Sequence, residues 1–136
     1  MDVRAYVWVD SWQFQCCGEV FRTGDDVRWD VLATPEGIGG VDDRLSADRA
    51  RRIHFQEEHH GGRTDGVLTG TVAGIQVLTV GRVLRERTRE TVPNSGRLRQ
   101  VDRADPWERE QPDRTFDGWI VELTSAAYTA GEPDPT

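Results

Sequence analysis

The stretch from Gly66 to Leu84, GVLTGTVAGIQVLTVGRVL, decides the fold of this chain. It is rich in valine, threonine, isoleucine and leucine, and Gly70, Gly74 and Gly81 interrupt it. β-Branched residues favour strands, and a glycine inside a strand marks a bend, a bulge or a close approach of two backbones. We therefore expect strands that curve or close, as in a small barrel.

Alternation of apolar and polar residues predicts further strands on both sides of this stretch. The expected elements are a strand over 3–9, a hairpin over 19–31 with its turn at 23–26, a hairpin of 82–92 with 97–102 joined by 93–96, and a last strand over 116–123. The second hairpin would place Glu90 opposite Arg99, so that arginines on one strand are neutralised across the pair.

One helix is expected over residues 45–60. This segment contains good helix formers, follows a suitable N-cap at Asp43 and ends at Gly61-Gly62, a typical C-terminal stop. The predicted fold is mainly β, a small, mostly antiparallel barrel or strongly curled sheet of six or seven strands with this one helix. We expect a single domain over 1–124 and a disordered acidic tail over 125–136.

Charge and cysteine usage restrict the partners and the compartment. The 136 residues carry a net charge of -7, which argues against nucleic acid, because phosphate binding depends on a basic surface. No secretory pattern opens the chain and no apolar run approaches the length of a membrane span, so we expect a cytoplasmic protein without a membrane partner. Two adjacent cysteines form no disulfide framework, which agrees with a reducing compartment.

The predicted helix carries the first candidate site. Ala50, Ile53, Glu57 and His60 follow the spacing of one helical face, so Glu57 and His60 should point inward with the apolar pair. A buried carboxylate and imidazole must be paired, hydrated or metal-bound. The alternative is a local structural pair at the helix end, with His60 stabilised by the helix dipole.

Cys16 and Cys17 extend this candidate site to a possible metal centre. A cysteine with Glu57, His59 and His60 matches the sulfur, nitrogen and oxygen ligands that zinc prefers, although the chain has no established zinc spacing. The alternative is that the cysteines are small buried hydrophobic residues.

Three of the tryptophans form a second candidate site. Trp8, Trp12 and Trp107 can form an aromatic binding surface, since indole combines a large contact area with a hydrogen-bond donor. The alternative is that they are packing residues. Trp29 and Trp119 lie on apolar strand faces and are expected in the core.

Two motifs resemble a family of small actinobacterial proteins of unknown function. They are W-x-x-W-Q-x-Q-C-C-G-E, from Trp8 to Glu19, and E-E-H-H-G-G, from Glu57 to Gly62. The likeness spans most of residues 6–123. The resemblance implies that the chain has relatives in this family, but it implies no activity, because the family has none established.

Three functions remain open at this point. The favoured one is a binding or interaction module with a polar His/Glu/Cys pocket, taking a protein or a small molecule, because no nucleophile elbow, phosphate loop or dinucleotide fingerprint is present. The second is a zinc-binding protein or metal-assisted hydrolase using Glu57, His60 and a cysteine, with Glu58 as base. The third makes Cys16 or Cys17 a nucleophile activated by a histidine.

Overall fold

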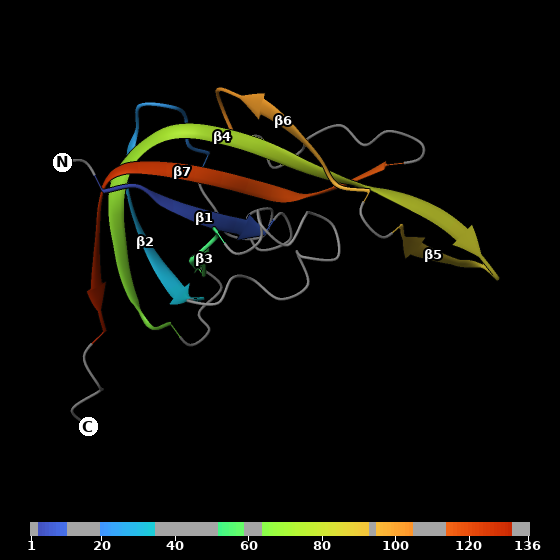
Figure 1. Ribbon diagram of the computed structural model, residues 1–136, viewed down its shortest axis with the longest axis horizontal. Coiled ribbons are helices and arrows are strands. Elements are labelled where there is room, and N and C mark those ends of the chain that lie inside the picture. The colour runs from blue at the N-terminus through green and yellow to red at the C-terminus, as the bar shows by residue number, and fades with distance from the viewer. Residues whose placement is uncertain are drawn as a thin grey trace.

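The computed structural model describes residues 3–10, 20–34, 52–58, 64–92, 95–104 and 114–131. These ranges contain seven strands and no helix (Figure 1). The strands are β1 (Ala5–Asp10), β2 (Asp26–Ala33), β3 (Phe55–Glu57), β4 (Gly66–Arg85), β5 (Thr88–Thr91), β6 (Arg97–Val101) and β7 (Arg114–Ala130). The prediction of a mainly β fold with six or seven strands is confirmed. Within the same ranges, no helix is long and apolar enough to cross a membrane.

Five of the strands form a closed ring of hydrogen-bonded neighbours. β2 pairs with β3, β3 with β1, β1 with β7, β7 with β4, and β4 again with β2. The β1–β3 pair is parallel and the other pairs are antiparallel, so the sheet is mixed but mostly antiparallel. β5 and β6 lie outside this ring, and each pairs with β4.

The two longest strands, β4 with 20 residues and β7 with 17, pair along most of their length. Their register shifts between Thr69 and Thr71, between Val72 and Gly74, and between Leu78 and Thr79. Such irregularities bend a strand and increase its twist. A Cβ at Gly70 would lie only 3.0 Å from Leu123 Cβ, so glycine allows β7 to approach closely at the bend. The predicted curvature of the glycine-interrupted stretch is confirmed, within one continuous strand.

Two apolar clusters cover the two faces of this sheet. The inner cluster draws buried residues from β1, β2, β4 and β7, and Phe55 of β3 packs against it. Trp119 is fully buried in this cluster, as predicted, with Phe116 at 4.8 Å and Phe21 at 6.3 Å between ring centroids. The outer cluster lies on the opposite side of β1, β4 and β7, because successive strand side chains alternate between faces. Its buried members are Trp8, Ile53, Leu78, Val80 and Ile120.

The predicted helix over 45–60 is wrong for the part that the structure describes. Phe55–Glu57 is a strand that pairs in parallel with β1, Val7 opposite Phe55, and antiparallel with β2, Val31 opposite Glu57. The backbone of this segment fills the gap between β1 and β2, and these tertiary hydrogen bonds override a weak helical propensity. Residues 45–51 and 59–60 lie outside the described ranges.

Both predicted hairpins are also corrected. The turn at Thr23–Gly24 exists, but Arg22 bridges to Arg103, and β2 pairs with β3 and β4 instead of with the preceding segment. The second hairpin turns at Glu86–Arg87, which have φ values of 46° and 72°. β5 and β6 therefore return along successive parts of β4, and Glu90 lies opposite Val83 instead of Arg99.

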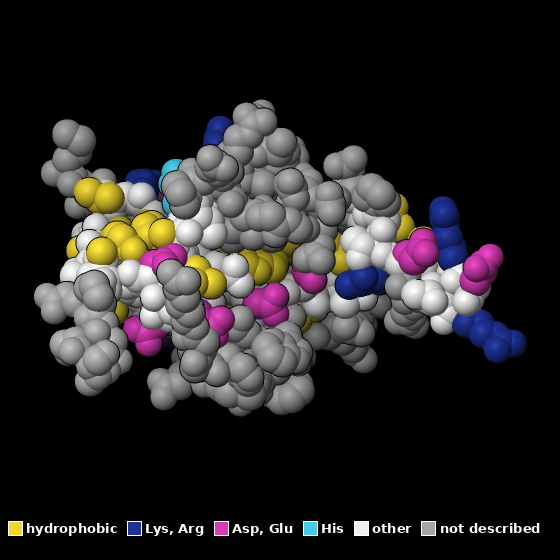
Figure 2. All heavy atoms as spheres, turned by 90° about the horizontal axis from the view of Figure 1, so that it is seen from below, with side chains coloured by type: hydrophobic (Ala, Val, Ile, Leu, Met, Phe, Trp, Pro, Cys, Tyr) yellow, Lys and Arg dark blue, Asp and Glu magenta, His cyan; other side chains and the backbone are white. Residues whose placement is uncertain are grey.

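The β4–β5 hairpin projects away from the ring (Figure 1). Basic and acidic side chains alternate at this end of the molecule in Figure 2, and Arg85 and Glu90 are 3.8 Å apart. At the other end, β7 continues to Ala130, seven residues beyond its predicted end at Leu123. Gly66 pairs with Ala130, so β4 extends the pairing past the predicted domain boundary at 124. Residues 132–136 of the predicted tail lie outside the described ranges.

Candidate ligand-binding site

Four neighbouring strands bring polar side chains together on the outer face. Tyr6 of β1 lies opposite Glu122 of β7, and Glu122 lies opposite Gly74 of β4. The next row on the same face is Trp8, Ile120, Gln76 and Gln100, from β1, β7, β4 and β6. Because residues two apart in a strand share a face, the two rows form one continuous surface.

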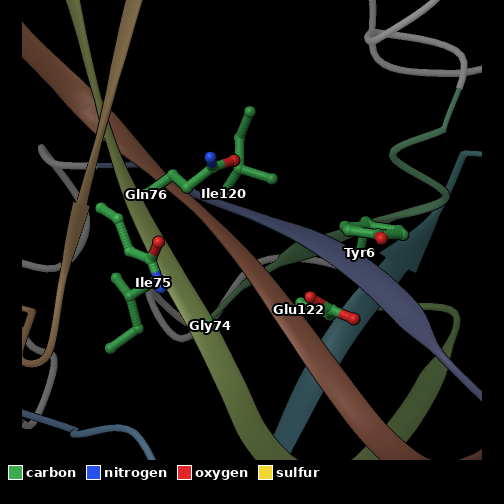
Figure 3. A pocket seen from close by; sticks show the side chains of 7 residues that line it. Tyr6, Gly74, Ile75, Gln76, Ile120 and Glu122 are labelled. Carbon is green, nitrogen blue, oxygen red and sulfur yellow. The ribbon is translucent and has the colours of Figure 1, made fainter.

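A hollow of about 240 Å³ opens between these rows. Figure 3 shows Tyr6, Glu122 and Ile120 on the same side of β7, with the Gln76 side chain extending from β4 toward Ile120. The lining residues are Tyr6, Gly74, Ile75, Gln76, Gln100, Ile120 and Glu122. Ile120 is buried in the outer cluster and gives the hollow an apolar base beneath a polar rim, whereas the side chain of Ile75 belongs to the inner cluster.

Gly74 keeps one side of the hollow open. It follows the register shift between Val72 and Gly74, and a Cβ placed on it would have Glu122 Oε2 as its nearest atom, at 3.7 Å. That distance is ordinary van der Waals contact, so the space above Gly74 is unfilled. A larger side chain at this position would extend into the hollow.

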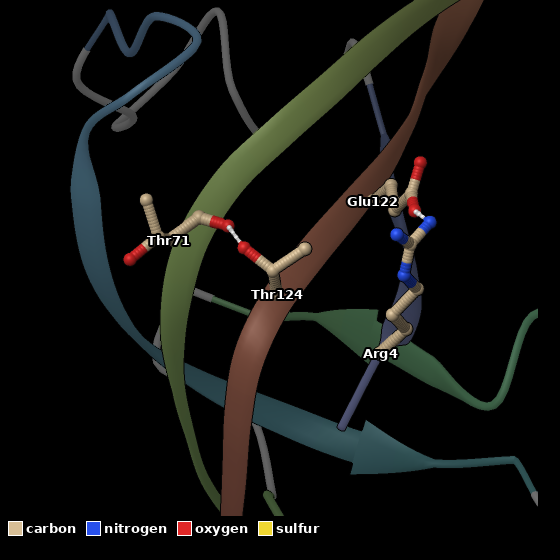
Figure 4. A network of polar contacts seen from close by, with 4 residues as sticks. All are labelled: Arg4, Thr71, Glu122 and Thr124. Atoms are coloured by element: carbon tan, nitrogen blue, oxygen red, sulfur yellow. Dashed lines mark hydrogen bonds and ion pairs between the residues drawn. The ribbon is translucent and has the colours of Figure 1, made fainter. Parts of the chain in front are cut away.

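Arg4 compensates the negative charge of Glu122 (Figure 4). Arg4 Nη1 donates to Glu122 Oε1 at 2.6 Å, and the two side chains are 64% and 24% exposed. The second carboxylate oxygen, Oε2, lies on the side of Gly74 and the hollow. Figure 4 also shows a contact between β4 and β7 beside their irregular pairing: the hydroxyl of Thr124 on β7 donates to the carbonyl oxygen of Thr71 on β4 at 3.4 Å.

The lining offers hydrogen bonds rather than acid–base chemistry. Gln76 and Gln100 supply donors and acceptors, the Tyr6 hydroxyl supplies both, and Glu122 Oε2 accepts. No histidine, cysteine or serine lines the hollow among the described residues, and Glu122 is its one carboxylate. Most glycosidases, for comparison, need two carboxylates. This set of groups can bind a neutral polar molecule.

A family model matches residues 3–125, which cover all of the hollow's lining and every ring strand except the last five residues of β7. The chain belongs to the DUF6578 family. The description of DUF6578 is a family of unknown function, so membership agrees with the expectation of an uncharacterised family and assigns no activity. Neither the curated proteins nor the solved structures contain a match to this DUF6578 chain.

Trp8 is buried in the outer cluster instead of facing solvent. It is 3% exposed and belongs to the outer cluster with Ile120, its cross-strand neighbour. A Cβ on Gly118 would lie 2.8 Å from Trp8 Cη2, so the indole lies directly on the glycine of β7. A largely buried indole offers little surface to a ligand. Trp12 and Trp107 lie outside the described ranges, so the three-tryptophan surface stays a prediction.

The predicted metal site of this DUF6578 protein has one described member. Glu57 is 4% exposed and is the only buried charged side chain in the described ranges, so its inward orientation is as expected, but from a strand. His59, His60, Cys16 and Cys17 lie outside these ranges. The part of the chain that the structure describes holds no group of three or more metal-binding side chains. Whether these five residues meet is therefore still a prediction.

Sequence reasoning missed all the polar residues of the hollow. One signal was available in the DUF6578 chain: Gln76 stands in the apolar run Ile75–Leu78, and a lone amide there indicates that one face of the strand meets water. Glu122 and Tyr6 become neighbours only through the β1–β7 register, which no local pattern specifies.

Proposed function

We propose that this protein is a non-catalytic binding module that holds a neutral polar group in the outer-face hollow. The observation that carries the proposal is the hollow itself, where two carboxamides, a phenol and a charge-compensated carboxylate surround an apolar base. Apolar surfaces with a few convergent polar groups are the usual form of a small-ligand site. In this proposal the closed ring acts as a small barrel that fixes the position of the four lining strands.

The size of the hollow limits what it can bind. Pockets that enclose drug-sized ligands measure roughly 300–1,000 Å³, and this one, at about 240 Å³, is smaller. It fits a small molecule or one unit of a larger ligand. The net charge of -7 and the carboxylate of Glu122 in the lining disfavour anionic ligands. A cytoplasmic location, with no membrane partner, is part of the same proposal.

Chemical-shift mapping with a mixed library of neutral polar fragments tests this function. We expect fragments that bind to perturb the backbone amides of Tyr6, Gln76 and Glu122, and the side-chain amides of Gln76 and Gln100. Gly74→Leu should abolish these perturbations, because leucine fills the space next to Glu122.

Ala73→Leu is the matched control. Ala73 is exposed on the same strand, next to Gly74, but does not line the hollow. Ala73→Leu should leave fragment binding at the hollow unchanged. Fragments that bind elsewhere, or that bind Gly74→Leu as well as the parent protein, would contradict the proposal.

A zinc site that includes Glu57 is the second candidate function. Its support is the inward position of Glu57, since a buried carboxylate is one of the ligands that zinc accepts. Elemental analysis of protein purified without a His-tag should give about one zinc per chain, and Glu57→Gln should lower it while Glu58→Gln, at the partly exposed neighbour, should not. Less than about a tenth of a zinc per chain would exclude this candidate, given the tight binding of zinc sites.

A further inference from the structure

The ring has a recognisable order of neighbours when it is followed from β4. Numbered from there in cyclic order, β4, β7, β1, β2 and β3 become strands one to five. The first strand (β4) then pairs with the second (β7) and with the fourth (β2). The second (β7) also pairs with the third (β1), and the fourth (β2) with the fifth (β3). The third (β1) and the fifth (β3) form the one parallel pair. This is the pairing scheme of the OB-fold, a five-stranded Greek-key barrel, including its single parallel pair. Here the chain is opened between the second and third strands.

Two further features agree with an opened OB-fold ring. Val3, just before β1, accepts a hydrogen bond from Ala126 N of β7 at 2.9 Å, so the segment that leads into β1 lies beside β7 at the opening. The strand that takes the first position, β4, is the longest, its pairing with β7 is irregular at three places, and it pairs with neighbours on both sides. Rearranged chain order is compatible with an unchanged packed ring, because termini that lie close together can be joined and the chain opened elsewhere.

The OB-fold binds oligonucleotides and oligosaccharides on the face of its second and third strands, together with the connection between the first and second. These positions correspond to β7, to β1 and to the β4–β7 connection, which contains β6. Four of the seven residues that line the hollow come from these positions: Tyr6 from β1, Ile120 and Glu122 from β7, and Gln100 from β6. The other three, Gly74, Ile75 and Gln76, come from the neighbouring strand β4. The topology and the hollow therefore point to the same face. Fold alone does not imply function, so the chemistry of this face must decide the ligand.

We infer that the ligand of the hollow is an uncharged oligosaccharide, one unit of which occupies the hollow while its neighbours extend along the outer face. This inference rests on the proposed binding function. An oligonucleotide would bring phosphates to a chain of net charge -7, next to the carboxylate of Glu122. A sugar hydroxyl both donates and accepts hydrogen bonds, as the carboxamides of Gln76 and Gln100 and the hydroxyl of Tyr6 require.

The test uses the full chain labelled with ¹⁵N and titrated with neutral trisaccharides of glucose, mannose, galactose and N-acetylglucosamine, and with a thymidine octanucleotide. We expect at least one trisaccharide to perturb the Tyr6, Gln76 and Glu122 resonances in a saturable way. Gly74→Leu should weaken that binding at least tenfold, and Ala73→Leu should leave it unchanged. The octanucleotide should cause no shift at the hollow.

The outcomes separate this inference from the proposed function. If neutral fragments bind in the hollow but no trisaccharide does, the binding function stands and the saccharide inference fails. If the octanucleotide binds there instead, the topological argument stands, but the choice of ligand is overturned. If neither fragments nor trisaccharides bind at the hollow, both proposals fail.

Discussion

Replacing Gly118 by alanine should destabilise the protein severely. An alanine Cβ would lie 2.5 Å from the carbonyl oxygen of Val9 and 2.8 Å from two ring carbons of Trp8. Carbon contacts normally measure about 3.5–4.0 Å, so β1 or the indole would have to move by about 1 Å. The clash with a backbone oxygen cannot be relieved by a rotamer change. We expect a loss of about 3 kcal/mol or more, at or above the upper end of overpacking costs.

The assay is equilibrium unfolding in urea, followed by tryptophan fluorescence. With a slope of about 2 kcal/mol per molar, a loss of about 3 kcal/mol lowers the midpoint by about 1.5 M. Gly74→Ala is the control, because the nearest atom to its Cβ would be 3.7 Å away. It should stay within about 0.5 kcal/mol of the parent, as surface substitutions usually do.

A midpoint for Gly118→Ala within about 0.3 M of the parent would refute the reasoning, since a loss this small corresponds to less than about 1 kcal/mol. It would mean that the indole of Trp8 does not lie on Gly118. The β1–β7 register would then be wrong, and the same register places Tyr6 opposite Glu122. The hollow and the stability prediction therefore share one structural premise.

Three further predictions concern the outer face and the hairpin. Trp8→Ala should cost about 3–5 kcal/mol in urea unfolding, because it leaves a cavity against Ile120; a loss below about 1 kcal/mol would show that the indole is not packed there. Arg4→Ala should cost only about 0.2–1 kcal/mol, because its pair with Glu122 is largely exposed, and the difference should shrink as salt is added; a difference that persists in 1 M NaCl would exclude a screened ion pair. Leu84→Ser should change the free energy of unfolding by no more than about 0.5 kcal/mol, since Leu84 is 68% exposed on the projecting hairpin; a larger loss would place that side chain against the ring.

The parts of the fold that the sequence could predict depend on local periodicity. Val7 and Val9 alternate toward the inner cluster, Trp119 lies on the apolar face of its strand, and the glycines of β4 accompany its bends. Each of these follows from the side-chain period of two and from the missing Cβ of glycine.

The elements that sequence reasoning placed wrongly depend on long-range pairing. Phe55–Glu57 contains residues compatible with a helix, but β1 and β2 supply hydrogen bonds that only a strand can accept. The Glu86–Arg87 turn has positive φ values without the asparagine or glycine that usually marks them, whereas the loop at 93–96 contains both and is the stronger turn signal in the sequence.

The candidate site was beyond prediction for the same reason. Its polar groups come from positions 6, 74, 76, 100 and 122, and only the pairing of β1, β7, β4 and β6 makes them neighbours. The register shift before Gly74 also changes which residues of β4 share a face with Glu122. Histidine and cysteine clusters are visible in a sequence because imidazole and thiolate are reactive and uncommon, whereas a site for neutral ligands needs only amides, hydroxyls and open space.

Backbone amide shifts during a saccharide titration test most directly whether the outer-face hollow is the ligand-binding site, because they locate the residues that respond to the bound ligand. We expect the largest saturable changes in amide chemical shift on β1, β4, β6 and β7, around Tyr6, Gln76, Gln100 and Glu122. Changes centred on the β4–β5 hairpin or around Glu57, with the outer face unaffected, would contradict it.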